Sequence, residues 1–391
     1  MKRILIFSLA YYPHIGGAEV AIKEITDRVD DVDFSLITLN MGNDKREESL
    51  GRVRVYRLGN GSSYVGKIFF VPLAAIKAWR LHRVHHFDGF WAMMSYMLFP
   101  IVLLRYMGVR PPYALTLQEG DPWKHMFGRW FILPFRPLIS YGFRNASVVQ
   151  TISTYLLEWA KKMGYPGHVE VIPNGCDTWW FSENSVGDRA VFWDHHGGVP
   201  GKGPVLITTS RLVEKNAVDV IIRALALLPP DFCLAVLGRG PERMKLDRLA
   251  QELGVADRVR FYEEIPNTKV VGYLHASDIF VRPSRSEGMG NSFIEAMAAG
   301  LPVVATQEGG IADFLFDARR NPQRPTTGWA VERDDPVQIA EAVQEIVTHR
   351  ETADQVTANA KEMVAKKYDW NLIAKNMRER VFGLLFDNHV H

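Results

Sequence analysis

Short apolar runs alternate with amphipathic stretches along almost the whole chain. In the first half, runs with the length and apolar content of buried strands lie at 3–10, 33–39, 52–58, 113–118, 147–152 and 169–173. In the second half they lie at 205–211, 232–238, 258–263, 278–284 and 301–306. The stretches between them have apolar positions at the spacing of one helix face, for example at 17–29, 153–164, 217–228, 241–254 and 335–347. This alternation of strands and helices predicts parallel sheets built from right-handed crossover units.

Chain length and one polar segment divide this pattern into two domains. The 391 residues are more than one hydrophobic core usually serves. The stretch 182–203 is polar and rich in glycine, which is typical of a connection between domains. The predicted fold class is therefore α/β, with two doubly wound, parallel-sheet, Rossmann-like domains that face each other across a cleft. Ligands of such sheets bind at the carboxyl ends of the strands, so we expect the chemistry in the turns that follow strands.

Composition indicates a soluble globular protein. Apolar residues make up 47% of the chain and charged residues 23%. Cys176 and Cys233 form neither a disulfide framework nor a metal-binding spacing, which suits a reducing, cytoplasmic location. No apolar run reaches the ~18 residues that a membrane span needs. The first residues run into Tyr-Tyr-Pro, so they are read as a strand and not as a signal peptide.

The formal net charge of +2 is unevenly distributed. Residues 51–150 contain thirteen Lys and Arg but only three acidic residues, Asp88, Glu119 and Asp121, and they are rich in aromatic side chains. A basic and aromatic surface predicts an anionic partner, such as phospholipid headgroups or a phosphorylated acceptor. The alternative is a buried helix with a solvated face. We expect peripheral contact with the inner face of an anionic membrane, and no nucleic-acid partner.

Three turns that follow predicted strands could bind phosphate. Gly16 and Gly17 let the backbone approach a ligand closely, although the third glycine of the dinucleotide fingerprint is missing. Arg211 and Lys215 could grip a pyrophosphate, and Gly238 could bring its backbone against one. Each turn also has a purely structural interpretation, as a tight strand–helix connection or a solvated loop.

Two glutamates flank the turn after the strand predicted at 278–284. Ser292 and Glu295 fit a capping box, which would explain Glu295 as a helix cap. Capping explains neither Glu287 nor the small residues of the "EGMGN" stretch just ahead of a helix. Carboxylates bind vicinal hydroxyls and free backbone amides bind phosphate, so a sugar nucleotide is the ligand that fits this set.

A further pair of acidic residues follows a predicted strand in the basic first half. Glu119 and Asp121 lie in "TLQEGDPW". Either carboxylate could face a reacting sugar or bind an acceptor hydroxyl. The sequence Gly-Asp-Pro is also ordinary turn chemistry, and both interpretations stay open.

Taken together, these turns resemble those of the family-4 retaining glycosyltransferases, which have the GT-B fold and include bacterial lipid and envelope glycosyltransferases. The resemblance spans nearly the whole chain. It is carried by "SEGMGNSFIEAMAAGLPVVAT", "SRLVEKN", "GRGPE", "HASDIFVRPS", "TISTYL", "VIPNGCD" and "GGAE". The chain departs from the family in having "QEGD" where many members have a histidine–glycine pair, and one residue fewer between Arg211 and Lys215.

The resemblance implies a role for each matched position. The implied catalytic residues are Arg211, Lys215 and Glu287. The implied donor-binding residues are Gly16, Gly17, Gly238, Gly288, Met289, Gly290, Asn291 and Glu295, with Glu295 on the ribose and Glu287 on the sugar. Further sugar or acceptor contacts are expected from His14, Glu119, Asp121, His125 and Asn174. No metal ligand and no cofactor are expected.

The resemblance also implies an activity and a division of labour. Residues 1–175, completed by the C-terminal helix at 370–391, would form the acceptor-side domain. Residues 176–203 would connect it to the nucleotide-sugar-binding domain at 204–369. The reaction would be metal-independent transfer of a hexosyl unit, with retention, from a UDP or GDP sugar to a hydroxyl of a glycan, lipid-linked or envelope acceptor. Two alternatives remain, a sugar-nucleotide enzyme of another class such as an epimerase, and a non-catalytic nucleotide-sugar-binding protein.

Overall fold

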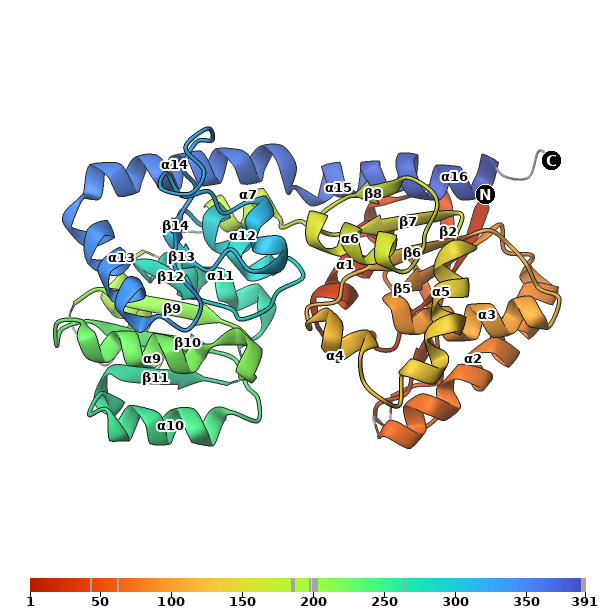
Figure 1. The fold of residues 1–391 in the computed structure, drawn as a ribbon, viewed down its shortest axis with the longest axis horizontal. Helices are drawn as coiled ribbons and strands as arrows, with labels where there is room; N and C mark the ends of the chain where they lie inside the picture. Colours follow the sequence, from red (N-terminus) through yellow and green to blue (C-terminus); the bar gives the residue numbers. More distant parts are fainter. Residues whose placement is uncertain are drawn as a thin grey trace. The chain divides into compact units, whose positions relative to one another are not determined.

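The chain folds into two compact units, each with its own sheet. The computed structural model describes residues 1–42, 44–61, 63–183, 187–196, 198, 203–263 and 265–387. One unit comprises Met1–Asn174 together with Trp370–His391, and the other comprises Gly175–Asp369 (Figure 1). The predicted α/β class with two parallel, doubly wound sheets is confirmed.

The first unit contains an eight-stranded sheet in the order β3-β4-β2-β1-β5-β6-β7-β8. Its strands are β1 (Lys2–Phe7), β2 (Val32–Leu39), β3 (Glu47–Leu50), β4 (Val53–Leu58), β5 (Gly89–Met93), β6 (Tyr113–Leu117), β7 (Val148–Thr151) and β8 (Val169–Val171). Its helices are α1 (Gly17–Arg28), α2 (Tyr64–His85), η1 (Ser95–Met97), α3 (Leu98–Tyr106), α4 (Trp123–Phe127), η2 (Leu133–Phe135), α5 (Arg136–Arg144), α6 (Thr154–Lys162), α15 (Trp370–Asn376), η6 (Met377–Phe382) and α16 (Gly383–Asp387).

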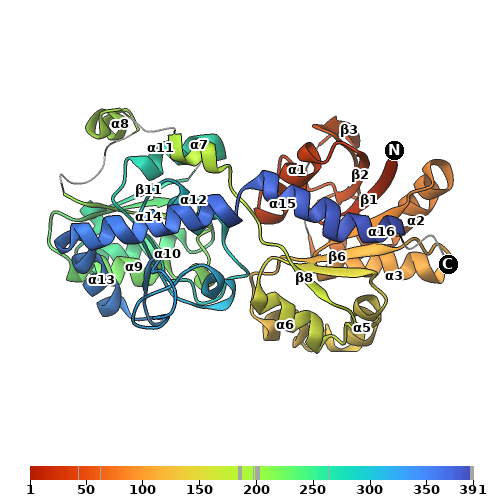
Figure 2. The ribbon, with the colours of Figure 1, turned by 90° about the horizontal axis from the view of Figure 1, so that it is seen from above.

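Alternation along the central strand β1 builds this unit in layers. Ile4 and Ile6 pack into one core with side chains of α1 and of the C-terminal helices. Leu5 and Phe7 point to the opposite face and are equally buried. This two-sided burial explains why the parallel strands read as continuous apolar runs. Figure 2 shows α15 and α16 running along this unit, where Phe382 packs against Trp91 with ring centroids 5.0 Å apart.

The second unit contains a six-stranded sheet in the order β11-β10-β9-β12-β13-β14. Its strands are β9 (Val205–Thr209), β10 (Cys233–Leu237), β11 (Val259–Tyr262), β12 (Ile279–Arg282), β13 (Val303–Ala305) and β14 (Trp329–Ala330). Its helices are α7 (Thr178–Glu183), α8 (Arg189–His195), η3 (Glu214–Asn216), α9 (Val218–Leu227), α10 (Arg243–Glu252), η4 (Ala256–Arg258), α11 (Asn267–His275), α12 (Asn291–Ala298), η5 (Gly309–Asp313), α13 (Pro336–Thr348) and α14 (Arg350–Lys367). All of the strand pairs in this sheet are parallel, so their carboxyl ends meet at one edge.

The segment 176–203, predicted as a connection between domains, carries two helices in its described part. In α8, Arg189 forms a two-pronged ion pair with Asp278, with N–O distances of 2.7 and 2.6 Å. In the same helix, Trp193 donates from Nε1 to the carbonyl of Ala276 (2.8 Å). These bonds attach α8 to the second unit beside α11, as Figure 2 shows. Residues 184–186, 197 and 199–202 of the predicted connection lie outside the described residues.

Two strands of the first sheet were not predicted. The edge strand β3 pairs antiparallel with β4, and its sequence Glu-Glu-Ser-Leu is too short and too polar to be recognised as a buried strand. Strand β5 is buried along its whole length between β1 and β6. Its sequence lies within an aromatic-rich stretch where a short apolar run cannot be distinguished from a helix.

Candidate active site

The loops at the carboxyl edge of the six-stranded sheet are bonded to one another through their backbones. The loop after β9 bonds to the loops after β10 and β12, and the loop after β12 bonds to the loop after β13. The bonds are Leu212 N–H to Arg239 O (3.0 Å), Arg285 N–H to Lys215 O (2.7 Å) and Gly310 N–H to Glu287 O (3.0 Å). Arg211, Lys215, Gly238, Glu287 and Glu295 are therefore carried by one connected layer, as the sequence predicted for residues that follow parallel strands.

Glycine at 238 is required by the packing of these loops. Gly238 has φ +144°, and a Cβ atom there would lie 1.9 Å from the carbonyl oxygen of Ser210. The loops after β9 and β10 therefore approach more closely than any side chain permits. Gly309 has φ +61°, and a Cβ atom there would lie 2.0 Å from the carbonyl oxygen of Glu287. A contact between Gly238 and a ligand stays a prediction.

Arg282, the last residue of β12, is a buried cation at the centre of this edge. Its guanidinium donates to Glu287 Oε2 (2.6 Å), Asn216 Oδ1 (3.1 Å) and Ser292 Oγ (2.6 Å). It also lies 5.1 Å from the ring centroid of Phe293. The side chains of Arg282 and Glu287 are each only 10% exposed, so the pair is largely removed from water. One cation thus fixes the loop after β9, the loop after β12 and the first turn of α12.

The loop that carries Arg211 and Lys215 is held at both ends. Asn216 donates from Nδ2 to the carbonyl of Arg211 (2.7 Å). At the other end, the Arg285 guanidinium pairs with Asp219 (2.7 Å), while the Arg285 backbone holds Lys215. The Arg211 side chain is exposed, and it forms no hydrogen bond or ion pair with any residue that the structure describes. A rigid loop therefore presents a guanidinium group to solvent, which suits an anionic ligand.

The capping-box interpretation of Ser292 and Glu295 is wrong. Helix α12 begins at Asn291, and its N-cap is Gly290, which has φ +88° and provides no side-chain cap. Ser292 lies within the helix, where its hydroxyl accepts a hydrogen bond from Arg282. The N-cap position is taken by Gly290, which has a positive φ. The Ser292 hydroxyl that was expected to cap the helix instead accepts a hydrogen bond from the buried Arg282 guanidinium.

The carboxyl group of Glu295 has no partner within the described parts of the chain. Burial raises the pKa of this carboxyl to about 7, and the nearby charge of Arg282 opposes the rise. A partly buried carboxyl without a hydrogen bond has been desolvated at a cost. Ligand hydroxyls would recover that cost, so Glu295 is a strong candidate for a ribose contact.

The remaining residues of the "EGMGN" turn are mostly enclosed. Gly288 is buried and donates its N–H to Glu287 Oε1 (3.1 Å). Met289 is 1% exposed, and Asn291 is the first residue of α12. The Gly288 amide is already used by Glu287. Its predicted contact with a ligand would therefore be shared with that bond.

In the first unit, the turn before α1 is exposed. Gly16 is the N-cap of α1 and Gly17 its first residue. The Glu19 carboxyl reaches back to Gly16, whose N–H lowers the pKa of that carboxyl while burial, the larger effect, raises it. His14, in the same turn, lies with Nε2 3.8 Å from Asp44 Oδ2. The turn is exposed, but the Gly16 N–H is already engaged by Glu19, so a phosphate contact at Gly16 stays a prediction.

Glu119 is built into the core of the first unit. Its Oε1 accepts from the Ser95 N–H (2.7 Å) and its Oε2 from the Gln118 N–H (3.0 Å), and the residue is 1% exposed. Burial raises the pKa of this carboxyl, although both hydrogen bonds favour the ionised form. These contacts account for Glu119 without a ligand. Its contact with a sugar stays a prediction.

The other candidates of the first unit follow its strands β6 and β8. Asn174 is buried and exchanges two hydrogen bonds with the side chain of Gln118, at 3.1 and 3.0 Å. Asp121 is half-buried. His125 is exposed, with Nδ1 3.0 Å from Arg129 Nη2. The roles proposed for these residues are not tested by their positions.

Sequence reasoning missed the three residues that organise the edge, Arg282, Asn216 and Arg285. One signal for Arg282 was present. An arginine inside the apolar run of β12 must be paired if it is buried, and Glu287 follows five residues later. No local pattern marked Asn216 or Arg285, since their partners come from distant loops.

Comparison with known proteins identifies the class of enzyme to which this fold and this edge belong. Residues 192–363 match the model described as "Glycosyl transferases group 1", and residues 15–180 match "Glycosyltransferase Family 4". The chain is 30% identical over 327 residues to a GDP-mannose-dependent alpha-(1-6)-phosphatidylinositol monomannoside mannosyltransferase of Mycolicibacterium smegmatis, covering 80% of this chain and 81% of that one. It is 32% identical over 209 residues to a lipopolysaccharide core biosynthesis glycosyltransferase of Rhizobium meliloti, covering 54% and 56%.

Solved structures agree on the fold. Sucrose-phosphate synthase of Thermosynechococcus elongatus superposes with a TM-score of 0.84 at 20% identity, over 99% of this chain and 100% of that one. HepE of Anabaena, in complex with UDP-glucose, gives 0.80 at 19% identity, over 98% and 100%. The protein is a glycosyltransferase. It belongs to the family-4 glycosyltransferases with the GT-B fold, as the sequence motifs predicted.

Proposed function

We propose that the protein transfers a mannosyl unit from GDP-mannose, with retention, to a hydroxyl of a glycan or lipid-linked acceptor at the membrane face. The carrying observation is the Arg282-centred layer, which presents Arg211 and Glu295 from one rigid edge. The choice of donor is supported by the relative named as GDP-mannose-dependent, which aligns with most of the chain. The acceptor class is supported by the lipid and lipopolysaccharide acceptors in the names of the relatives.

Each part of the donor has a matching group in this edge. Glu295 would accept hydrogen bonds from the ribose hydroxyls, and Arg211 with Lys215 would neutralise the diphosphate. The amides at the start of α12 would contact the same phosphates. Glu287, held by Arg282, would accept from a hydroxyl of the sugar through the oxygen that also accepts from Gly288.

The chemistry follows from positioning and charge. The acceptor hydroxyl would attack the anomeric carbon on the face from which the diphosphate departs, and the leaving phosphate would take the hydroxyl proton. The bond from carbon to the diphosphate oxygen breaks as the bond to the acceptor oxygen forms. Arg211 and Lys215 would stabilise the charge that grows on the leaving group. Within the described residues no cluster of three His, Cys, Asp or Glu could hold a metal ion. We propose that the reaction needs no metal ion, and an activity assay with a chelator tests this.

A thermal-shift screen of nucleotide sugars tests the donor. Ligands that bind only the folded protein raise its melting temperature by mass action. We expect GDP-mannose to give the largest shift among GDP, UDP, ADP and TDP sugars, and EDTA to leave it unchanged. The absence of a shift with every one of these sugars would contradict the proposal.

Replacing Arg211 with alanine should slow transfer more than it weakens donor binding. Its guanidinium has no partner among the described residues, so the melting temperature should hardly change. Losing one group that stabilises developing charge typically costs about 10²–10³ in kcat. The matched control is Arg223→Ala, an exposed arginine on α9 that should leave kcat unaltered. Equal kcat values for Arg211→Ala and Arg223→Ala would remove Arg211 from the mechanism.

An exposed apolar surface on the first unit supports membrane contact. Along α2, Tyr64, Val65, Ile68 and Phe69 are 61–65% exposed, and Trp130 is 81% exposed. The Tyr64 hydroxyl accepts from Arg129 (3.3 Å), which ties α2 to the segment that contains Trp130. The helices built from described residues include none long and apolar enough to cross a membrane. The contact that we propose is peripheral, through these exposed aromatic and aliphatic side chains beside basic ones.

Co-sedimentation with vesicles tests this surface. We expect the protein to pellet with anionic phospholipid vesicles more than with neutral ones, and Phe69→Asp to reduce the bound fraction several-fold. Val337→Asp is the matched control, because it adds the same charge at an exposed valine in the first turn of α13. Background recovery of the wild type with both vesicle types would exclude membrane contact.

A further inference from the structure

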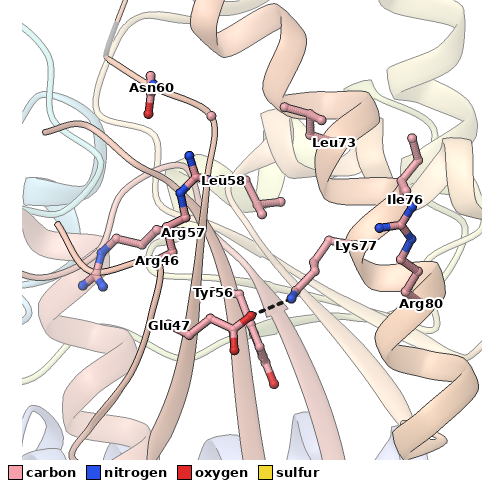
Figure 3. Close-up of a pocket in the computed structure, with 11 residues that line it drawn as sticks. Arg46, Glu47, Tyr56, Arg57, Leu58, Asn60, Leu73, Ile76, Lys77 and Arg80 are labelled. Carbon is pink, nitrogen blue, oxygen red and sulfur yellow. Dashed lines mark hydrogen bonds and ion pairs between the residues drawn. The ribbon is translucent and has the colours of Figure 1, made fainter. Parts of the chain in front are cut away.

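A pocket of about 500 Å³ lies in the first unit, whereas Glu287 and Glu295 belong to the second. It is formed between the strands β3 and β4 and the helix α2 (Figure 3). Four basic side chains line it, against one acidic side chain, Glu47. The basic residues are Arg46, Arg57, Lys77 and Arg80. None of the residues that line this pocket has a role implied by the family resemblance.

Two of the four cationic side chains form ion pairs within the first unit. Arg57 is buried and pairs with Glu48 (2.5 Å), and it donates to the carbonyl of Tyr12 (2.5 Å). Lys77 pairs with Glu47 (2.8 Å), as the dashed line in Figure 3 shows, and lies 4.4 Å from the ring centroid of Tyr56. These bonds neutralise both acids of the strand β3 and fix the walls of the pocket.

The other two cations have no counter-ion among the described residues. The side chains of Arg46 and Arg80 are exposed, and neither guanidinium forms a hydrogen bond or an ion pair with a residue in the described ranges. The backbone of Arg46 is nevertheless fixed, because its carbonyl accepts from the Arg57 N–H (2.8 Å). The pocket therefore offers two exposed guanidinium groups. One is on Arg46, just before β3 and bonded through its backbone to β4, and the other is on Arg80 of α2, on the opposite side of the pocket (Figure 3). Phosphate oxygens match the guanidinium fork.

The same pocket opens onto apolar side chains. Leu73 and Ile76 line it and are 43% and 41% exposed. They continue, along α2, the exposed surface that contains Ile68 and Phe69. A free phosphate ion would make no favourable contact with these apolar side chains. A phosphate that carries an alkyl or acyl group would contact both sides at once.

The pocket is also connected to the turn that was predicted to face the donor. Arg57, which forms part of the pocket wall, holds the carbonyl of Tyr12 at the start of that turn, four residues before Gly16. A ligand anchored in the pocket would therefore lie beside the exposed turn of the first unit. This placement suits an acceptor and not the donor, whose phosphates have the Arg211 loop.

We propose that this pocket binds the phosphate-bearing headgroup of a lipid-borne acceptor, between Arg46 on one side and Arg80 on the other, with the surface at Leu73 and Ile76 along its apolar part. The proposal rests on the function proposed above and assigns the acceptor to a chemical class, anionic phospholipids and their glycosylated derivatives. The pocket selects the acceptor, whereas the carboxyl edge of the second unit binds the donor.

Calorimetric titration of the full chain, without donor, tests the pocket. The probes are dihexanoylphosphatidylinositol below its critical micelle concentration, dihexanoylglycerol and inorganic phosphate. We expect the phospholipid to bind, and both other probes to bind at least tenfold more weakly. Arg46→Gln/Arg80→Gln should weaken phospholipid binding at least tenfold. Arg80→Gln alone should show part of that loss. Arg83→Gln, an exposed position on the same helix outside the pocket, should bind as the wild type does.

Each other outcome overturns a stated part of the proposal. Unchanged phospholipid binding by the double variant excludes the pocket as its site. Inorganic phosphate binding as tightly as the phospholipid excludes a lipid-borne ligand. The thermal shift with GDP-mannose is measured on the same samples and should be equal for the wild type and the double variant. Its absence from the wild type would overturn the proposed function, independently of the lipid result.

Discussion

Arg282→Met should destabilise the second unit by about 3–5 kcal/mol and abolish transfer. The substitution leaves the Glu287 carboxylate buried without a counter-ion, which is among the most costly single changes in a folded protein. It also removes the donor to Asn216 and to Ser292. The measurement is chemical unfolding followed by a signal from the second unit, with activity assayed in parallel.

The double variant Arg282→Met/Glu287→Met separates stability from function. Removing both charges leaves no uncompensated carboxylate, so most of the lost stability should return. Activity should not return, because the loop with Asn216 and the sugar contact of Glu287 are both lost. Recovery of transfer in the double variant would show that the Arg282–Glu287 pair is only a packing feature. A loss below about 1 kcal/mol for Arg282→Met would contradict the buried pair itself.

Glu295→Gln should weaken donor binding and stabilise the free protein at alkaline pH. Ionised Glu295 would accept from both ribose hydroxyls, and a charged hydrogen bond of this kind is worth about 1.5–3 kcal/mol. We therefore expect GDP-mannose affinity to fall at least tenfold at pH 8. The matched control is Glu252→Gln, an exposed glutamate at the end of α10.

The effect of Glu295 on stability depends on pH in a defined direction. Burial raises the pKa of this carboxyl to about 7, so the folded protein holds the proton more tightly than the unfolded chain. The stabilising contribution of Glu295 to the free energy of unfolding is therefore fully present below the unfolded pKa of about 4.3, and it is lost as pH rises through 7. Glutamine removes this loss. The variant should be about 1–2 kcal/mol more stable than the wild type at pH 8 and similar near pH 4.5.

Donor affinity should follow the same ionisation. In the wild type it should rise between pH 6 and pH 8, because the ribose contact needs the carboxylate, and in Glu295→Gln it should be independent of pH over that range. Titration calorimetry at several pH values measures both. Unchanged affinity in Glu295→Gln, together with a lower melting temperature, would show that Glu295 serves stability alone.

The parallel sheets, and the sheet edge at which the candidate residues lie, could be predicted because they depend on local patterns. Strands buried on both faces read as continuous apolar runs, as β1 and β10 do, and their carboxyl ends must share an edge. This rule places Arg211, Lys215, Glu287 and Glu295 after β9 and β12 of one sheet, and their roles in binding and catalysis stay predictions.

The contacts that organise the edge could not be predicted, because they join distant loops. Arg282 reaches back 66 residues to Asn216, and Arg285 reaches Asp219 over the same separation. The competition between Arg282 and a helix cap for Ser292 is likewise invisible in the motif Ser-x-x-Glu. Glu119 was equally plausible as a turn residue and as a sugar contact until its two backbone donors were seen.

Real-time proton NMR of GDP-α-mannose turnover, with water as the acceptor, tests the central claim most directly. The anomeric signals distinguish the first mannose formed before mutarotation mixes the two forms. Release of GDP with α-mannose appearing first is the predicted result. Release of β-mannose first, or formation of an epimerised GDP sugar without release of GDP, would contradict retaining transfer from this donor.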